Sequence, residues 1–240
     1  MSRTSLWSRF KPDASRRRLI EFARAAGQSL APGALVLDAG SGKAPYRQLF
    51  SHAAYETADF LQVDKGYGQV TYVCDLRSIP VESGRFDLVF CSQTLEHVPE
   101  PKAVLAEFLR VLKPGGKLWL TAPFTYEEHE TPYDFYRYSS YGLRHLLETT
   151  GFAIERIEWL EGYLGTMSHQ LSRAYKWVPL RPRHYGGGMV GWIAVAFSLL
   201  VRPVFALSAI VYARLELRHA YTGAGQCVNY LVVASRPPTA

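Results

Sequence analysis

The feature that most limits the fold of this 240-residue chain is a regular alternation of short apolar runs with helix-like patterns. The runs typical of buried strands are residues 34–40, 53–60, 70–76, 86–92, 117–123, 153–160 and 229–235. The segments predicted to be helices are residues 15–30, 45–53, 100–113 and 139–152. Strands that alternate with helices predict an α/β fold, with a mostly parallel seven-stranded sheet and helices on both faces. The last two strands lack a short helical crossover, so the seventh is expected to be antiparallel.

One segment interrupts this alternation between the sixth and seventh strands. Residues 188–215 are almost wholly apolar, but Arg202 and Pro203 lie in their middle. A membrane-spanning helix needs about 20 unbroken apolar residues. Proline kinks a helix, and a central arginine is costly in lipid. We therefore expect a helical hairpin that dips into one leaflet; two helices packed on protein or at a dimer interface, and a kinked span, are the alternatives.

The net charge is concentrated in the same part of the chain. Residues 173–219 hold seven basic side chains against one acid, Glu216, which accounts for the whole net charge of +6. Basic and apolar residues in one segment favour an anionic membrane surface over nucleic acid as the partner. We therefore predict a first domain of residues 1–165 and 226–240, and a basic, apolar helical insert of residues 166–225.

Composition excludes several other classes of protein. Hydrophobic residues make up 48% of the chain and charged residues 20%, which excludes wholesale disorder. Three cysteines cannot form a disulfide framework, and no CxxC or Cys/His ligand spacing is present. The basic N-terminal stretch contains no uninterrupted apolar run typical of a secretory signal. We therefore expect a reduced, intracellular and metal-free protein.

A short motif after the first strand gives the first indication of a ligand. In VLDAGSGKAP, Asp38 lies near the strand's end, and Gly40 and Gly42 follow. Glycines allow a tight turn and let a ligand approach the backbone closely. On its own this pattern is weak, because an ordinary strand-to-helix turn has the same composition.

Acidic residues also end the second and third strands. Asp59 could accept hydrogen bonds from both ribose hydroxyls, with Asp64 as its rival, and Asp75 could accept from an adenine amine while Leu76 packs on the ring. The carboxyl ends of neighbouring parallel strands meet at one crevice. The pattern predicts a nucleoside with an amine-bearing tail. Pro45, at the third position of the glycine pattern, argues against a dinucleotide.

Together these motifs resemble class I S-adenosylmethionine-dependent methyltransferases. The similar segments are residues 35–42, 74–80, 86–101, 111–123 and 129–152. The chain looks most like a type 11-like bacterial branch, often encoded near cell-envelope polysaccharide genes. The resemblance covers roughly residues 15–165 and 226–237 and implies a Rossmann-like sheet. Ala44-Pro45 departs from it, because many members have another glycine there.

The resemblance also implies which residues bind the cofactor, S-adenosylmethionine. The methionine portion is assigned to Asp38, Gly40 and Gly42, the ribose to Asp59, the adenine to Asp75 and Leu76, and the surroundings of the sulfonium to Ser92 and Gln93. No metal ligand is expected.

Methyl transfer from a sulfonium chiefly requires alignment of the acceptor, and a base is needed only if the acceptor must lose a proton. His129, after the fifth strand, is the candidate base or acceptor contact, with a solvated loop histidine as the alternative. His97 is expected to shape its own loop. Asp134 and Arg137 are expected to form an ion pair that orders the loop around His129.

We therefore expect methyl transfer to a hydroxyl oxygen of a small-molecule, glycan or lipid-linked acceptor. A non-catalytic domain that binds a cofactor or partner is the alternative. The expected location is the cytoplasm, at the inner face of the membrane if residues 188–215 bind lipid. Homodimer formation is left open, and no nucleic acid is expected.

Overall fold

The computed structural model describes residues 13–61, 63 and 66–238. The described chain divides into two compact units. The core unit comprises residues 18–160 and 229–238, and the helical unit comprises residues 13–17 and 161–228.

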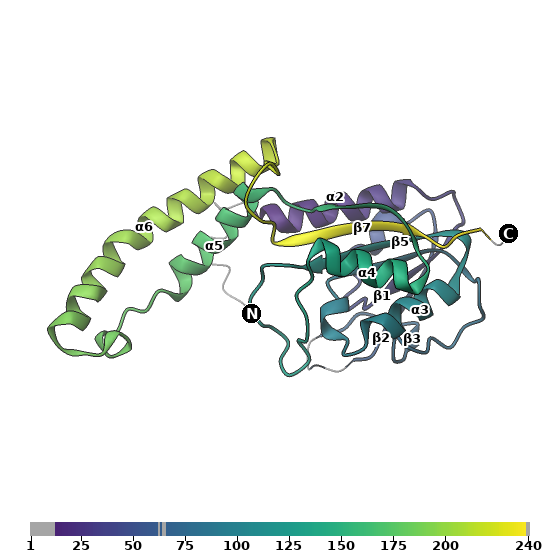
Figure 1. Ribbon diagram of the computed structural model, residues 1–240, viewed down its shortest axis with the longest axis horizontal. Coiled ribbons are helices and arrows are strands. Elements are labelled where there is room, and N and C mark those ends of the chain that lie inside the picture. The colour runs from purple at the N-terminus through teal and green to yellow at the C-terminus, as the bar shows by residue number, and fades with distance from the viewer. Residues whose placement is uncertain (1–12, 62, 64–65, 239–240) are drawn as a thin grey trace. The chain divides into compact units, whose positions relative to one another are not determined.

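The core unit is built on one seven-stranded sheet, in the order β3-β2-β1-β4-β5-β7-β6 (Figure 1). The strands are β1 (Leu35–Ala39), β2 (Ala54–Asp59), β3 (Tyr72–Val73), β4 (Phe86–Ser92), β5 (Leu112–Pro123), β6 (Ala153–Trp159) and β7 (Asn229–Ser235). β7 pairs antiparallel with β5 and β6, whereas β1 to β5 pair in parallel. The predicted seven-stranded, mostly parallel sheet with an antiparallel last strand is therefore confirmed.

Helices cover both faces of this sheet (Figure 1). They are α2 (Ala14–Gln28), α3 (Pro101–Val111) and α4 (Ser140–Thr150). α2 contributes Phe22 and Ala26 to a buried cluster with Val36 and Phe90 of the sheet. Because β1 and β4 are central, successive residues such as Val36 and Leu37 are both fully buried. This explains why these strands appear in the sequence as continuous apolar runs.

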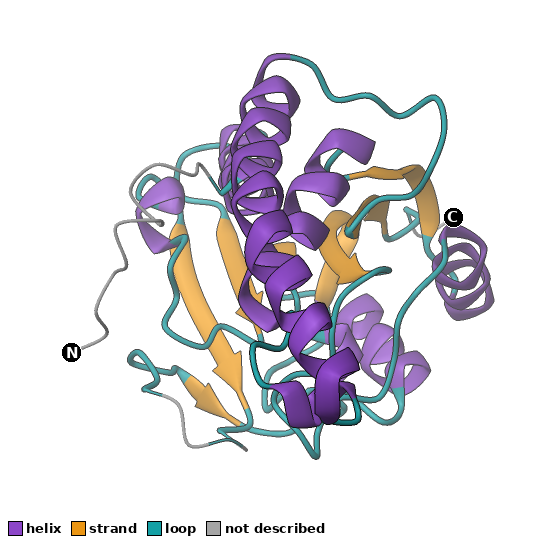
Figure 2. Cartoon of the chain, turned by 90° about the vertical axis from the view of Figure 1, so that its left-hand side faces the viewer, coloured by secondary structure: helices purple, strands orange, loops and turns teal. Residues whose placement is uncertain are grey.

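Three predicted boundaries in the core unit were wrong. The helix expected at residues 45–53 is a single 3-10 turn, η1 (Arg47–Phe50), because β2 begins only a few residues later. β5 begins at residue 112, before the proline and glycines that were expected to precede it, and its register with β4 shifts there. β3 is only two residues long and appears as a short arrow at the edge of the strand layer (Figure 2).

The helical unit contains α5 (Tyr163–Trp177), the 3-10 turn η3 (Pro182–Tyr185) and α6 (Gly188–Arg218). α6 continues through Pro203, so the predicted break there, and with it the hairpin or helix pair within residues 188–215, was wrong. The third alternative, a kinked membrane span, stays a prediction. The charged side chain in the middle of α6 has a hydrogen-bond partner. Arg202 Nε donates to the Tyr175 carbonyl in the last turn of α5 at 2.8 Å.

The sequence patterns did not predict α5, and its packing explains why. Its buried face consists of Gly165, Thr166, Ser168 and Ser172 rather than large apolar side chains. α6 meets it with small residues, and the Ser168 hydroxyl donates to the Ala209 carbonyl at 2.8 Å. Small residues let two helix backbones approach closely. A search for apolar periodicity therefore misses this pair.

Candidate functional site

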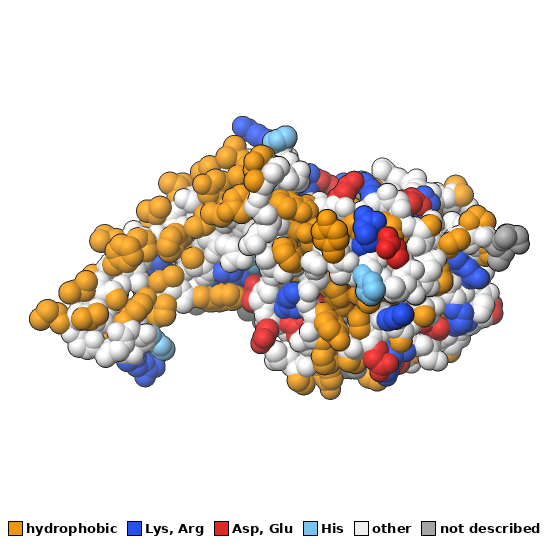
Figure 3. Space-filling view, in the orientation of Figure 1, with side chains coloured by type: hydrophobic (Ala, Val, Ile, Leu, Met, Phe, Trp, Pro, Cys, Tyr) orange, Lys and Arg blue, Asp and Glu red, His pale blue; other side chains and the backbone are white. Residues whose placement is uncertain are grey.

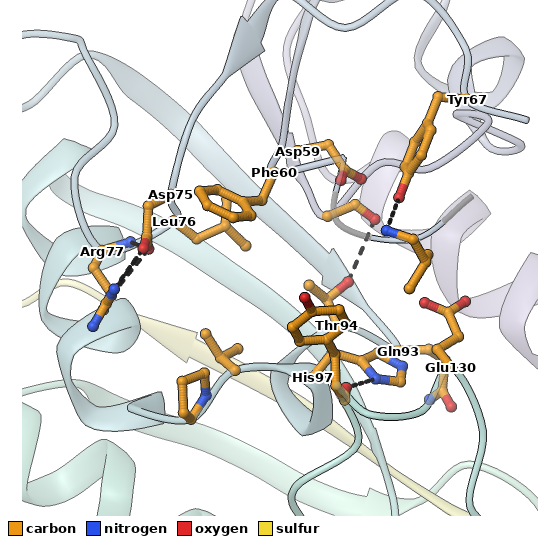
Figure 4. Close-up of a pocket in the computed structure, with 15 residues that line it drawn as sticks. Asp59, Phe60, Tyr67, Asp75, Leu76, Arg77, Gln93, Thr94, His97 and Glu130 are labelled. Carbon is orange, nitrogen blue, oxygen red and sulfur yellow. Dashed lines mark hydrogen bonds and ion pairs between the residues drawn. The ribbon is translucent and has the colours of Figure 1, made fainter. Parts of the chain in front are cut away.

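A pocket of the core unit lies where β1, β2 and β4 end (Figure 4). Of the residues predicted to bind a cofactor, it is lined by Gly40, Asp59, Asp75, Leu76 and Gln93. Three separate motifs of the sequence therefore meet at one place, as the carboxyl ends of parallel strands must. The rival acid Asp64 lies outside the described residues.

The glycine turn after β1 is held in a conformation that a side chain would not tolerate. Gly40 has a φ of +77°, and a Cβ there would lie 2.2 Å from the Thr94 side chain. Gly42 has a φ of +52°, and a Cβ there would meet open space. The next turn residue but one, Ala44, also adopts a positive φ, of 49°. The turn thus leaves bare backbone open to a ligand.

Asp59 joins this turn to the end of β2. Its Oδ2 accepts from the Gly42 N–H at 2.9 Å, and its Oδ1 accepts from the Leu61 N–H at 3.0 Å. Each carboxylate oxygen has two lone pairs, so both retain capacity for a ligand hydroxyl. The carboxylate lines the pocket beside the exposed ring of Phe60 (Figure 4).

Asp75 lies two residues beyond β3 and is paired within the chain. Arg77 Nη2 lies 2.7 Å from its Oδ2, and the Arg77 N–H donates to its Oδ1 at 2.8 Å. These hydrogen bonds lower the pKa of Asp75 below its ordinary value. Leu76 is buried against the pocket wall. A flat ligand ring at Leu76 would lie beside an anionic, fixed carboxylate.

Asp38 lies behind the pocket rather than in its wall. Only 3% of the residue is exposed, and its Oδ2 accepts from the Tyr55 hydroxyl of β2. Burial raises the pKa of Asp38 to about 7, and the bond from Tyr55 opposes that rise. Asp38 fixes the strand end from which the glycine turn leaves, and its contact with the methionine portion stays a prediction.

The two residues predicted near the sulfonium differ in position. Gln93 lines the pocket with a φ of +54°, and its Nε2 donates to Thr121 Oγ1 at 3.1 Å. Ser92 is still within β4, and its Oγ lies 3.1 Å from the same Thr121 hydroxyl. Ser92 therefore supports Gln93 from behind rather than lining the pocket.

His129 lies beside the pocket wall in the loop after β5. The backbone N–H of His129 donates to Asp134 Oδ2 at 2.7 Å. Arg137 binds the same carboxylate, with its Nη1 2.7 Å from Oδ1. This confirms the predicted ion pair, which lowers the pKa of Asp134 to about 2. The loop around His129 is thus ordered by a buried carboxylate. His97, expected to shape its loop, also lines the pocket, and its Nδ1 lies 2.7 Å from the Tyr133 carbonyl oxygen.

Nine pocket residues were not singled out by sequence reasoning: Phe60, Val63, Tyr67, Arg77, Thr94, Val98, Pro99, Glu130 and Tyr133. Tyr67, Glu130 and Tyr133 lie in segments without regular secondary structure, so no periodicity marks them. Phe60 directly follows the acid that ends β2, and an aromatic at that position was the one available signal.

Comparisons with known proteins bear on this arrangement. A family model described as a methyltransferase domain matches residues 37–120, which contain the glycine turn, Asp59, Asp75 and Gln93. A ubiquinone biosynthesis O-methyltransferase of Coxiella burnetii is 31% identical over 101 residues, covering 37% of this chain and 43% of that protein. The chain spans less than half the length of the curated relatives it matches.

Solved structures share the fold across most of the chain. The [4+2]-cyclase SpnF has a TM-score of 0.58 at 20% identity, over 92% of this chain and 82% of that one. The 1,6-didemethyltoxoflavin-N1-methyltransferase of Burkholderia thailandensis, solved with S-adenosylhomocysteine, has a TM-score of 0.54 at 15% identity, over 98% and 82%. Identities this low establish the fold and leave the reaction to be argued from the site.

The core unit has the class I methyltransferase fold, and the methyltransferase-domain model matches its residues 37–120. The strand order with an antiparallel β7, and the family match over the glycine turn, both support this assignment. In this fold the pocket lies where ligands bind in open α/β sheets, beyond the carboxyl ends of the strands.

Proposed function

We propose that the chain binds S-adenosylmethionine in this pocket and transfers its methyl group to a hydroxyl oxygen of a small-molecule, glycan or lipid-linked acceptor. The observation that carries the proposal is the hydrogen bond by which the Gly42 N–H of the glycine turn binds the Asp59 carboxylate. The turn is a cradle that a side chain at Gly40 would fill. The cofactor supplies a methyl group on a sulfonium that is already activated.

The chain's own residues then have to hold and align the reactants. The glycine turn at Gly40 fits an amine-bearing tail, Asp59 fits ribose hydroxyls, and Leu76 fits one face of a flat base. Alignment at short range, with water excluded, is the main contribution such an enzyme makes. The oxygen acceptor is supported by the O-methyltransferase relatives.

A variant of Asp59 tests the binding part of the proposal. Asp59→Ala should weaken the binding of S-adenosylmethionine by about 1.5–3 kcal/mol, or roughly 10- to 150-fold, the range for losing charged hydrogen bonds. Isothermal titration calorimetry measures this directly. Glu148→Gln removes an acid from the surface of α4 and serves as the charge-matched control. Unchanged affinity in Asp59→Ala would remove the ribose assignment.

The catalytic part is tested with methyl-labelled cofactor and extracts of membranes and glycans. We expect one class of labelled product in which the methyl group survives alkali, as an ether does and a methyl ester does not. A domain that binds the cofactor or a partner without transferring a methyl group is the second candidate, since a protein named for a different activity, a [4+2]-cyclase, shares this fold. Cofactor binding without transfer to any extract would favour that candidate.

The proposed membrane surface is the outer face of α6. The helix is long and apolar enough to cross a bilayer, and only 22% of its most apolar window is buried. Exposed side chains on it include Trp192, Phe197, Leu200 and Leu207. Figure 3 shows hydrophobic side chains gathered along this helix. The surrounding excess of basic residues fits an anionic lipid surface.

Vesicle flotation tests this surface. The full chain should float with vesicles that contain phosphatidylglycerol, and less with neutral ones. Because burying each large apolar side chain is worth about 1.5–3 kcal/mol, the triple change Trp192→Ser, Phe197→Ser and Leu200→Ser should reduce binding at least roughly tenfold. Tyr141→Ser, an exposed aromatic of the core unit, is the control. Equal flotation of the triple variant would exclude α6 as the lipid contact.

A further inference from the structure

Three side chains beside the pocket form a cluster that methyl transfer as proposed above does not use. Glu96 and His97 lie in the 3-10 turn η2 (Leu95–His97) after β4, and His129 lies in the loop after β5. One candidate ligand atom from each lies within 4.8 Å of the others. The two histidine rings meet edge to face, with centroids 4.7 Å apart.

Glu96 is the unusual member of this cluster. It is 0% exposed, and neither carboxylate oxygen has a hydrogen-bond partner among the residues that the structure describes. The nearest cationic candidate is His97, whose Nε2 lies 3.9 Å from Oε1. A buried carboxylate normally has a charge partner, a full set of hydrogen bonds or a metal ion, because its desolvation is costly. The position of Glu96 is therefore explained if a cation binds between these groups.

Both histidines are oriented so that one ring nitrogen remains available. His97 Nδ1 lies 2.7 Å from the Tyr133 carbonyl oxygen. His129 Nδ1 lies 3.2 Å from the Glu127 carbonyl oxygen and 3.4 Å from Asp134 Oδ2. An oxygen acceptor at Nδ1 places the ring proton there and leaves the Nε2 lone pair for a ligand. Metal-binding histidines are typically oriented in this way by carbonyl or carboxylate groups.

We propose that Glu96, His97 and His129 bind one divalent transition-metal ion, with Zn²⁺ as the reference case. Two imidazoles and one carboxylate suit Zn²⁺ and similar ions, and three protein ligands leave a coordination position open. Ligand atoms about 2.0–2.2 Å from the ion would lie roughly 3.5 Å apart, so binding should draw the three side chains slightly together.

The open position would face the pocket, because His97 forms part of its wall (Figure 4). An ion there would be placed to bind the oxygen of an acceptor and orient it. This role toward the acceptor rests on the proposed methyl transfer, whereas the binding of the ion does not.

Titration of the full chain with metal alone tests the proposal. The protein, free of any affinity tag, is treated with chelator and dialysed, and Zn²⁺ is then added in a calorimeter without cofactor or acceptor. We expect one equivalent bound per chain. Co²⁺, used as a spectroscopic probe, should show the visible absorption of a site with nitrogen ligands. Glu96→Gln and His129→Ala should each weaken binding at least roughly tenfold, and His145→Ala, on the exposed surface of α4, should not.

Stability measurements separate loss of a ligand from loss of the fold. Glu96→Gln keeps the shape of this buried side chain, so the metal-free variant should melt close to the unmodified chain. Absence of saturable binding at one equivalent, or binding by both cluster variants as tight as that of the unmodified chain, would overturn the proposal. Either result would leave the proposed cofactor site and methyl transfer unaffected, because the titration contains neither cofactor nor acceptor.

Discussion

Replacing Gly40 with alanine is expected to weaken the binding of S-adenosylhomocysteine about a hundredfold. The first contribution is conformational, since a φ of +77° costs a side-chain-bearing residue roughly 1 kcal/mol or more. The second is steric, because the new Cβ would lie 2.2 Å from both Oγ1 and Cγ2 of Thr94. Such overpacking typically costs about 1–3 kcal/mol. Thr94 lines the pocket, so its displacement disturbs the binding site itself.

Gly42→Ala provides a matched control, two residues away in the same turn. Its φ of +52° imposes a comparable conformational cost, but its Cβ would meet nothing within 4 Å. We expect it to weaken binding only about fivefold, or roughly 1 kcal/mol. Calorimetric titration of both variants gives the comparison. Equal losses in the two would show that backbone conformation alone, and not contact with Thr94, governs the turn.

The largest expected effect on stability lies in the helical unit, at Glu216. This carboxylate is 0% exposed and accepts from the Gly162 N–H at 2.9 Å and the Gly165 N–H at 3.0 Å. It thus binds the first turn of α5, where free N–H groups and the helix dipole favour an anion. Glu216→Ala would leave both N–H groups buried and without this acceptor. We expect the free energy of unfolding of the helical unit to fall by about 2–4 kcal/mol.

Hydrogen exchange localises this effect better than a melting curve of the whole chain. The amides of Gly162 and Gly165 should exchange much faster in Glu216→Ala, while those of the core sheet should not change. Glu216→Gln keeps one acceptor oxygen and should lose only part of the protection. Unchanged protection of the α5 amides in the alanine variant would show that the carboxylate does not hold that helix end.

The sheet was predictable from the sequence because its strands are short, apolar and separated by turn residues. Each of the seven predicted runs overlaps an observed strand. The exceptions are local. η1 has too few residues to form a helix before β2, and the bulge at the start of β5 depends on pairing with β4 rather than on β5 itself.

The helical unit was harder to predict because its interior is made of small side chains. The buried face of α5 consists of small residues such as Ser168, which packs against Ala209 of α6, so no pattern of large apolar residues predicted this helix. Arg202 and Pro203 suggested a break in α6, yet the helix continues because the arginine reaches the last turn of a helix that the sequence did not predict. Because α5 was not predicted, its hydrogen bond to Arg202 could not be predicted from the sequence either.

The pocket was predictable only where residues follow strands directly. Gly40, Asp59 and Asp75 could be placed together because parallel strands end at one edge. The ligand set formed by Glu96, His97 and His129 could not, because it joins two segments 32 residues apart and shows no short ligand spacing. The expectation of a metal-free protein rested on that missing spacing.

Hydrogen–deuterium exchange with and without S-adenosylhomocysteine tests most directly whether a nucleoside ligand binds beyond β1, β2 and β4. The ligand should slow exchange at residues 40–42, 59–61, 75–77 and 92–94, and leave the helical unit unchanged, whereas NAD should slow none of them. Protection confined to other segments, or equal protection by NAD, would contradict the assignment of this pocket.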